Sequence, residues 1–212
     1  DAFKCCTQLT SINIPKSVKS METEVFSYCT ALTCITFEPG SNLTEVKPNG
    51  PCKLFTHTSS ELKVYCEPGL KATLSEKGVP DERIITTVDV TLVDGDTITP
   101  KKIDYGAKIA ALGTPTKPGY TPSSFTGWYT DADCTEQYPA AQLFTNINGT
   151  KLYAGWAGTD LTVKNGTISV VDSDGNPLAI ELKNGKAKVP AGAKVTVTFD
   201  RAAATDNDLK FD

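Results

Sequence analysis

The chain has 212 residues, of which 39% are apolar and 22% charged, the balance of an ordinary globular protein. Lys and Arg total 21 against 25 Asp and Glu, and no third of the chain is basic. This charge distribution excludes the basic footprint of a nucleic-acid-binding protein. No apolar run approaches the roughly 20 residues that a membrane helix needs, so we expect no membrane span in this stretch of sequence.

A repeat of 23 residues opens the sequence. Phe3 to Ile14 aligns with Phe26 to Phe37. A weaker third copy follows at an offset of 29, with Phe55 over Phe26 and Val64 over Ile35, although residues 48–53 interrupt it. Each copy carries an apolar pattern typical of one short strand per turn, with Leu9, Ile12 and Ile14 inward in the first turn. The pattern predicts a solenoid, whose turns are stable only when they stack.

An amphipathic helix is predicted from Leu70 to Lys77, after the third strand, and it is closed by Gly78 and Pro80. We interpret this helix as the cap of the stack and end the first segment at residue 87. Because the chain opens inside a repeat, we expect it to be a mature or trimmed piece of a longer protein.

The repeat motif itself resembles a known family. The stretch Ala2 to Pro15 reads AF-x-x-C-x-x-L-x-x-I-x-I-P, and Phe26, Cys29 and Leu32 return in the next copy. This pattern resembles the BspA-like leucine-rich repeats of bacterial surface proteins over residues 1–85. The resemblance implies a cell-surface or secreted location.

The middle segment, residues 88–157, begins with a change of pattern. Val88, Val90 and Leu92 alternate as in a strand, Asp94-Gly95-Asp96 turns the chain, and a second strand ends near Tyr105. Both tryptophans of the chain lie in this segment. Because a unit of this size has little core volume, we expect them mainly in the core.

Several motifs of this segment also match a family. They are Pro118-Gly119-Tyr120, Phe125 to Asp131 and Leu152 to Trp156. Together they resemble the Listeria–Bacteroides repeat of the internalin B-repeat type. The resemblance implies a small β-grasp-like module of secreted, surface-anchored proteins that serves as a spacer or interaction module.

The last segment, residues 158–212, predicts a small β-meander or sandwich-like domain. Leu161 to Lys164 and Thr167 to Val171 flank Asn165-Gly166, which is the signal of a tight hairpin. Further turns are expected at Asp174-Gly175 and Asn184-Gly185, and a strand follows over Val195, Val197 and Phe199.

Candidate metal and catalytic residues are few. Asp172-x-Asp174-x-Asn176 begins like a calcium loop, but Pro177 stands where Gly is needed, so we expect a hairpin turn. His57 aligns with Tyr28 in a repeat turn, which does not suit a catalytic triad. The cysteine spacing does not fit a zinc site, and we expect buried free thiols at Cys6 and Cys29. We therefore expect no metal, no cofactor and no enzyme activity.

The whole sequence predicts a multidomain, mainly β protein: leucine-rich repeats with a cap (1–87), a β-grasp-like module (88–157) and a small β domain (158–212). The expected function is non-catalytic adhesion or protein binding at a bacterial surface, with an extracellular protein or glycan as the partner and a monomeric chain. Two alternatives remain open. One is a carbohydrate-binding module using Trp128, Tyr129 and Trp156, and the other is a passive spacer.

The repeat pattern also places a candidate binding strip. Positions three and five of L-x-x-I-x-I face outward, and neighbouring turns lie at strand spacing, about 4.8 Å apart. The two outward rows are Ser11, Cys34 and Lys63, and Asn13, Thr36 and Tyr65. Tyr65 is the expected aromatic anchor, since aromatic side chains often dominate binding energy. A solvated sheet face is the alternative interpretation of this strip.

Overall fold

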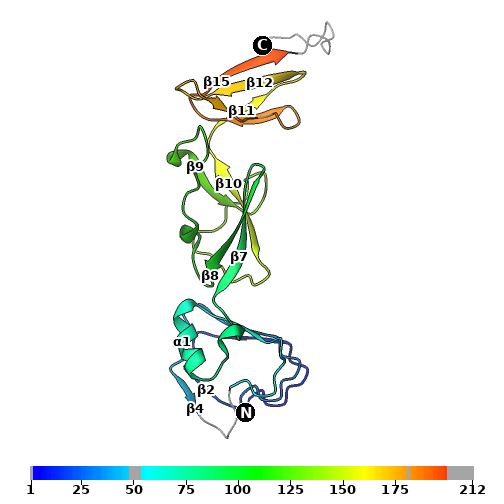
Figure 1. The fold of residues 1–212 in the computed structure, drawn as a ribbon, viewed down its shortest axis with the longest axis vertical. Helices are drawn as coiled ribbons and strands as arrows, with labels where there is room; N and C mark the ends of the chain where they lie inside the picture. Colours follow the sequence, from blue (N-terminus) through cyan, green and yellow to red (C-terminus); the bar gives the residue numbers. More distant parts are fainter. Residues whose placement is uncertain (1, 48–53, 181, 200–212) are drawn as a thin grey trace. The chain divides into compact units, whose positions relative to one another are not determined.

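The computed structural model describes residues 2–47, 54–180 and 182–199, and most of its regular structure is β (Figure 1). Internal contacts divide the chain into two compact units, residues 1–113 with 138–152, and residues 114–137 with 153–212. The predicted segment boundaries after residues 87 and 157 stay a prediction. The expected interruption of the third repeat at 48–53 lies outside the described residues.

A parallel sheet runs through the repeat turns of the first unit. Its strands, in spatial order, are β1 (Ser11–Ile14), β3 (Cys34–Phe37), β5 (Lys63–Tyr65) and β6 (Ile84–Ile85). Ser11 pairs with Cys34, which pairs in turn with Lys63. These pairs confirm the offsets of 23 and 29 that the sequence predicts.

A core of aligned side chains lies beneath this sheet. The rings of Phe3 and Phe26 stack with centroids 5.6 Å apart, and the Phe26 and Phe55 centroids are 5.8 Å apart. In the second turn Leu32 and Ile35 are fully buried. The predicted inward positions of this turn are therefore confirmed, and the phenylalanines join the three copies.

The first turn is less buried than the second. Phe3, Leu9 and Ile12 are only partly buried against the core, whereas their counterparts Phe26, Leu32 and Ile35 are at most 1% exposed. Each turn of the stack covers the apolar side of its neighbour. Within the described residues, no turn covers the outer side of the first one, so Phe3, Leu9 and Ile12 stay partly exposed, whereas Ile14 is 5% exposed.

A second, smaller sheet joins the first two turns. Strand β2 (Ser20–Glu22) runs parallel to β4 (Glu45–Lys47), and Met21 pairs with Val46. The sequence predicted one strand per turn and missed these two, because three-residue strands leave almost no periodic signal.

The predicted helix is confirmed as α1 (Pro68–Glu76), which begins two residues before the expected start. Pro68 stands in its first turn, where the fixed backbone angle of proline suits helix initiation. Leu70 and Leu74 are buried in the core of the repeat turns, and Gly78 ends the helical region with a φ of +87°. The helix therefore packs on the repeat core, as expected of a cap.

The described residues also form short 3-10 helices, named η1 (Asp81–Arg83), η2 (Ile109–Leu112) and η3 (Pro122–Ser124).

The middle segment forms the strand order β8-β7-β10-β9. Strands β7 (Thr87–Asp94) and β8 (Thr97–Asp104) make an antiparallel hairpin in which Asp94 pairs with Thr97, as the sequence predicts. Strand β10 (Thr150–Trp156) pairs antiparallel with β9 (Phe125–Tyr129). Residues 150–152 of β10 belong to the first unit and residues 153–156 to the second.

The last segment forms two small antiparallel sheets. Strand β11 (Thr159–Thr162) pairs with β14 (Lys186–Val189), while β12 (Gly166–Val171) lies between β13 (Pro177–Leu178) and β15 (Lys194–Phe199). The predicted turn around Asp174-Gly175 and the predicted final strand are confirmed. The predicted hairpin across Asn165-Gly166 is wrong, because the two strands that flank it belong to different sheets.

Backbone angles explain this error. A type I′ hairpin turn needs positive φ at both central residues. Asn184 and Gly185 meet that condition, with φ of 52° and 76°, and the backbone groups of Lys183 and Lys186 bond to each other across the turn. At Asn165-Gly166, in contrast, the asparagine has positive φ and the glycine does not. The chain therefore leaves β11 without folding back on it.

Candidate functional site

The predicted binding strip lies on the parallel sheet, and its two rows are in register. Asn13 pairs with Thr36, which pairs with Tyr65 on the next strand. The hydroxyl of Thr36 donates a 2.9 Å hydrogen bond to Oδ1 of Asn13. In the other row Ser11 and Lys63 are exposed, while Cys34 between them is half-buried. The strip is thus a largely polar surface three strands wide.

Tyr65, the expected aromatic anchor, lies against another tyrosine. Its ring centroid is 6.4 Å from that of Tyr105, which follows strand β8 and is 3% exposed. Burial raises the pKa of both phenols. The ring of Tyr65 therefore packs against Tyr105 at one end of the strip and is only half exposed.

The side chain of Glu67, near this end of the strip, contacts the backbone of two glycines. Its carboxylate accepts a 2.6 Å hydrogen bond from the N–H of Gly40. Gly106, with a φ of +85°, lies so close to Glu67 that an added Cβ would come within 2.9 Å of that side chain. The sequence did not predict this contact, since no local pattern signals a neighbour so distant along the chain.

The three aromatic residues of the carbohydrate alternative face different surroundings. Trp128 is 5% exposed and Trp156 is 6% exposed, and the ring of Phe125 meets both edge-on at 5.5 Å and 5.4 Å. Neighbours on a strand point to opposite faces of the sheet, so Trp128 and Tyr129 cannot share one platform. The Tyr129 hydroxyl donates to Oγ1 of Thr126 at 3.2 Å. The burial of both tryptophans agrees with their expected place in the core.

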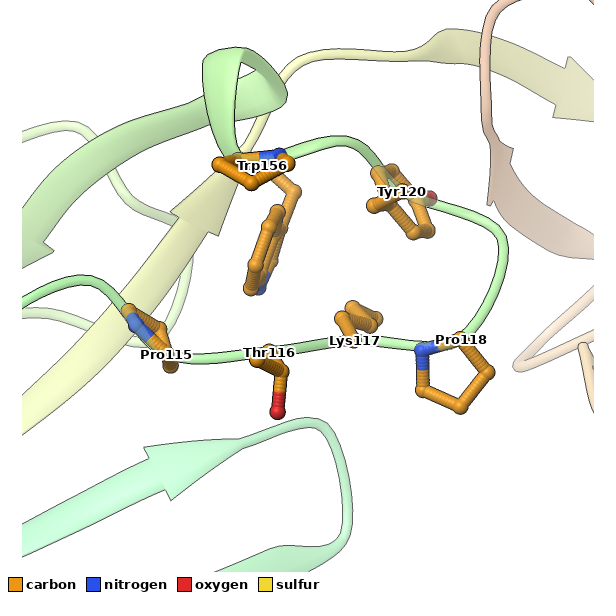
Figure 2. A pocket seen from close by; sticks show the side chains of 7 residues that line it. Pro115, Thr116, Lys117, Pro118, Tyr120 and Trp156 are labelled. Carbon is orange, nitrogen blue, oxygen red and sulfur yellow. The ribbon is translucent and has the colours of Figure 1, made fainter.

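Trp156 also borders an open hollow of about 290 Å³ in the second unit. Figure 2 shows Trp156 and Tyr120 on one side of it and the chain from Pro115 to Pro118 on the other. The Tyr120 and Trp156 centroids are 5.3 Å apart, with their planes at 53°. The ammonium group of Lys117 lies 5.3 Å from the Tyr120 centroid and 5.6 Å from that of Trp156. No sequence pattern predicted that Lys117 and Tyr120 lie beside Trp156, since more than 30 residues separate them from it in the chain.

The side chain of His57 stacks on the aromatic ring of the preceding repeat turn. His57 lies parallel on Tyr28, as their alignment predicts, and both are exposed. Cys5, Tyr28 and His57 occupy the same place in three turns, with left-handed φ values of 63°, 64° and 58°. The geometry gives His57 a stacking partner.

Two acidic loops, the calcium-like loop of Asp172 and the loop of Asp131, hold their carboxylates by internal hydrogen bonds. Asp172 accepts from the backbone N–H of Asp174 and Asn176 at 2.9 Å and 2.8 Å. Asp131 accepts from the N–H of Glu136 at 2.7 Å. The side-chain amide of Asn176, followed by its backbone N–H, lowers the pKa of the Asp172 carboxyl group. The backbone N–H groups of Glu136 and Thr135 lower the pKa of Asp131. The described part of the chain contains no cluster of three or more side chains suited to a metal ion.

The cysteines among the described residues are free thiols. Cys29 is fully buried, as predicted, and its Sγ lies 3.0 Å from the carbonyl oxygen of Phe3. Cys6 is only half-buried, because the first turn is covered on one side alone. Cys66 is also fully buried, and burial raises its pKa to about 12.

Comparison with protein families identifies both repeat segments. Residues 1–57 match the model of the BspA type leucine-rich repeat region. Residues 87–155 match the Listeria-Bacteroides repeat domain. Both resemblances are confirmed, in the predicted order. A comparison with curated proteins finds no match to the chain.

These families are typical of bacterial surface proteins, so the chain carries surface-protein repeat modules. Repeat families of this kind are typically non-catalytic. In the parts of the chain that are described, no helix has the length and apolar character to cross a membrane.

Proposed function

We propose that the chain is a non-catalytic adhesion module of a bacterial surface protein and that it binds an extracellular protein through the strip on its parallel sheet. The repeats would form a short solenoid, and the middle segment a β-grasp-like module beside it. The observation that carries the proposal is the register of the outward rows, Ser11-Cys34-Lys63 and Asn13-Thr36-Tyr65, across three strands of a matched leucine-rich repeat.

The strip suits a partner surface for two physical reasons. Its strands are fixed by backbone pairing and by the core beneath them, so little side-chain order has to be created on binding. The ring of Tyr65 also packs against Tyr105, and tyrosine is one of the residue types enriched in binding hot spots.

A bead adhesion assay tests the proposal directly. Beads coated with the chain are counted on epithelial monolayers and on surfaces coated with fibronectin or collagen. The test variant is Thr36→Glu with Lys63→Glu, which places negative charge in both rows of the strip. Tyr65 is left unchanged because its replacement would also disturb the contact with Tyr105. We expect at least a tenfold loss of adhesion with an unchanged melting temperature.

The matched control is Thr99→Glu with Lys101→Glu, which replaces an exposed threonine and an exposed lysine in strand β8 of the same unit. It makes the same change of net charge on a strand outside the strip and should leave adhesion unchanged. Equal adhesion of the strip double variant and the wild type would contradict the proposal. Loss of wild-type adhesion after enzymatic removal of surface glycans would favour the carbohydrate alternative, and adhesion to none of the surfaces would favour the spacer.

A further inference from the structure

We propose that Pro100, together with Lys101, keeps the outer edge of strand β8 from pairing with a second copy of the chain. The proposal concerns self-association and does not depend on the proposed adhesion function. Strand β8 is an outer strand of the sheet β8-β7-β10-β9, and among the described residues no strand pairs with its second side. An open strand edge of this kind is a template on which another chain can pair.

The geometry of the hairpin decides which backbone groups of β8 point to this edge. Asp94 and Thr97 close a two-residue turn, so they exchange hydrogen bonds, and every second pair along the hairpin does the same. The N–H of Tyr105 donates to the carbonyl oxygen of Thr86 at 2.8 Å, as this alternation requires. The positions whose backbone groups point away from β7 are therefore Ile98, Pro100 and Lys102.

The edge is long and accessible enough to take another strand. Strand β8 has 8 residues, and all of them except Ile103 are exposed. Ile98 near its start is 63% exposed, which adds an apolar side chain to the open edge. Long, exposed edges with apolar residues are the ones that associate unless the sequence blocks them.

Pro100 lies at the centre of the outward positions. Proline has no backbone N–H, and its ring fills the space that the backbone of an added strand would approach. In two copies of β8 paired antiparallel around this position, Ile98 of one would lie opposite Lys102 of the other, and both central hydrogen bonds would be missing. Within the hairpin Pro100 removes no hydrogen bond, because its nitrogen points away from β7.

Lys101 adds a charge on the core side of the same edge. It pairs with Val90, which is 1% exposed, so both side chains lie on the face of the sheet that carries the core. The Nζ of Lys101 donates to the carbonyl oxygen of Leu112 at 3.4 Å. An added strand would have to bury this ammonium group further, which is unfavourable, and inward-pointing charges are a known protection of sheet edges.

The oligomeric state of edge variants tests the proposal. The main variant is the full chain with Pro100→Thr and Lys101→Thr, because threonine supplies the missing N–H and favours strands. Sedimentation equilibrium with a reducing agent, at micromolar to submillimolar protein, compares it with the wild type. We expect the double variant to form dimers with at least tenfold tighter self-association than the wild type.

Two single variants separate the contributions. Lys101→Thr is the matched control, since it changes the net charge equally and leaves Pro100 in place; its self-association should stay within about twofold of the wild type. Pro100→Thr alone should dimerise, though more weakly than the double variant. Melting curves of each variant establish that it is folded.

Hydrogen exchange locates the contact. In the wild type the amides of Ile98 and Lys102 should exchange fast and that of Thr99, which faces β7, slowly. In the dimer of the double variant Ile98 and Lys102 should become protected.

Three results would overturn the proposal. They are a double variant that stays monomeric, a dimer that leaves both outward amides unprotected, and equal self-association of Lys101→Thr and the double variant. Protection of Ile98 and Lys102 in the wild-type monomer would refute the open edge itself, even if a variant failed to fold.

Discussion

The imidazole ring of His57 lies on the phenol ring of Tyr28, with their centroids 4.4 Å apart and their planes within 6° of parallel. The two residues are 29 positions apart in the chain and occupy the same place in successive repeat turns. Both have left-handed backbone angles, which are unfavourable for bulky side chains. The stack therefore joins two strained turns at the surface of the repeat region.

A double-mutant cycle measures this contact. Tyr28→Ala, His57→Ala and the combined variant should give a coupling free energy of about 0.5–1.5 kcal/mol, the range of aromatic pairs. Urea unfolding at neutral pH supplies the four stabilities. Additive effects of the two changes would show that the rings lie side by side without stabilising each other.

Truncation of the repeat core should be much more costly. Ile35 in strand β3 is fully buried, so Ile35→Ala removes apolar contacts and leaves a cavity. We expect a loss of about 2–5 kcal/mol in the free energy of unfolding. Ile98→Ala is the control, since Ile98 is 63% exposed; it should change stability by about 0.5 kcal/mol or less. A denaturant midpoint unchanged in Ile35→Ala would contradict the inward register.

Thiol reactivity should follow burial in the repeats. With Cys52→Ser as the background, iodoacetamide at pH 8 and peptide mass spectrometry give the order of alkylation. Exposed Cys5 should react first, while Cys29 and Cys66 should react only after unfolding. Burial raises the pKa of both inner thiols, that of Cys66 to about 12, which keeps them protonated and unreactive. Disulfide-linked peptides in the native protein would refute the free-thiol assignment.

The Asp131 loop should show a pH-dependent stability. Backbone N–H groups of Glu136 and Thr135 lower the pKa of this carboxyl below its unfolded value. A depressed folded pKa gives stability above the unfolded pKa and loses it as the pH falls through the folded one. Asp131→Asn should therefore melt below the wild type at pH 7, and the gap should close as the pH falls below about 3.9.

The control for this loop is Asp133→Asn, which removes a neighbouring charge and leaves the Asp131 hydrogen bonds in place. Melting curves at several pH values compare the two variants with the wild type. A constant difference between Asp131→Asn and wild type at every pH would mean that the charge of Asp131 is irrelevant to the loop.

The repeat register could be predicted from the sequence because identical turns repeat their residues at fixed offsets. One alignment of Phe3 with Phe26 therefore predicted the strand pairing and the inward positions together. The short strands β2 and β4 escaped prediction, because three residues are too few to show a period. The partial burial of Cys6 could not be predicted either, because the burial of a side chain depends on the neighbouring turn that covers it and not only on its own turn.

The pairs Asn165-Gly166 and Asn184-Gly185 show a second limit of prediction from the sequence. Both predict a hairpin turn, yet only Asn184-Gly185 makes one, because Gly166 is extended and begins strand β12. The pairing partner of a strand decides between such outcomes, and it lies far along the chain. The hollow at Trp156 and the contact of Tyr65 with Tyr105 could not be predicted for the same reason, because they also join residues that are far apart in the chain.

Helix α1 packs on one side of the repeat core through Leu70 and Leu74. A turn inserted between strand β5 and this helix would have to displace the helix from the core. A duplicated turn inserted between β1 and β3 would instead find a parallel strand on each side and would leave the helix contacts in place. Duplication within the array can thus lengthen the repeats without rebuilding their cap.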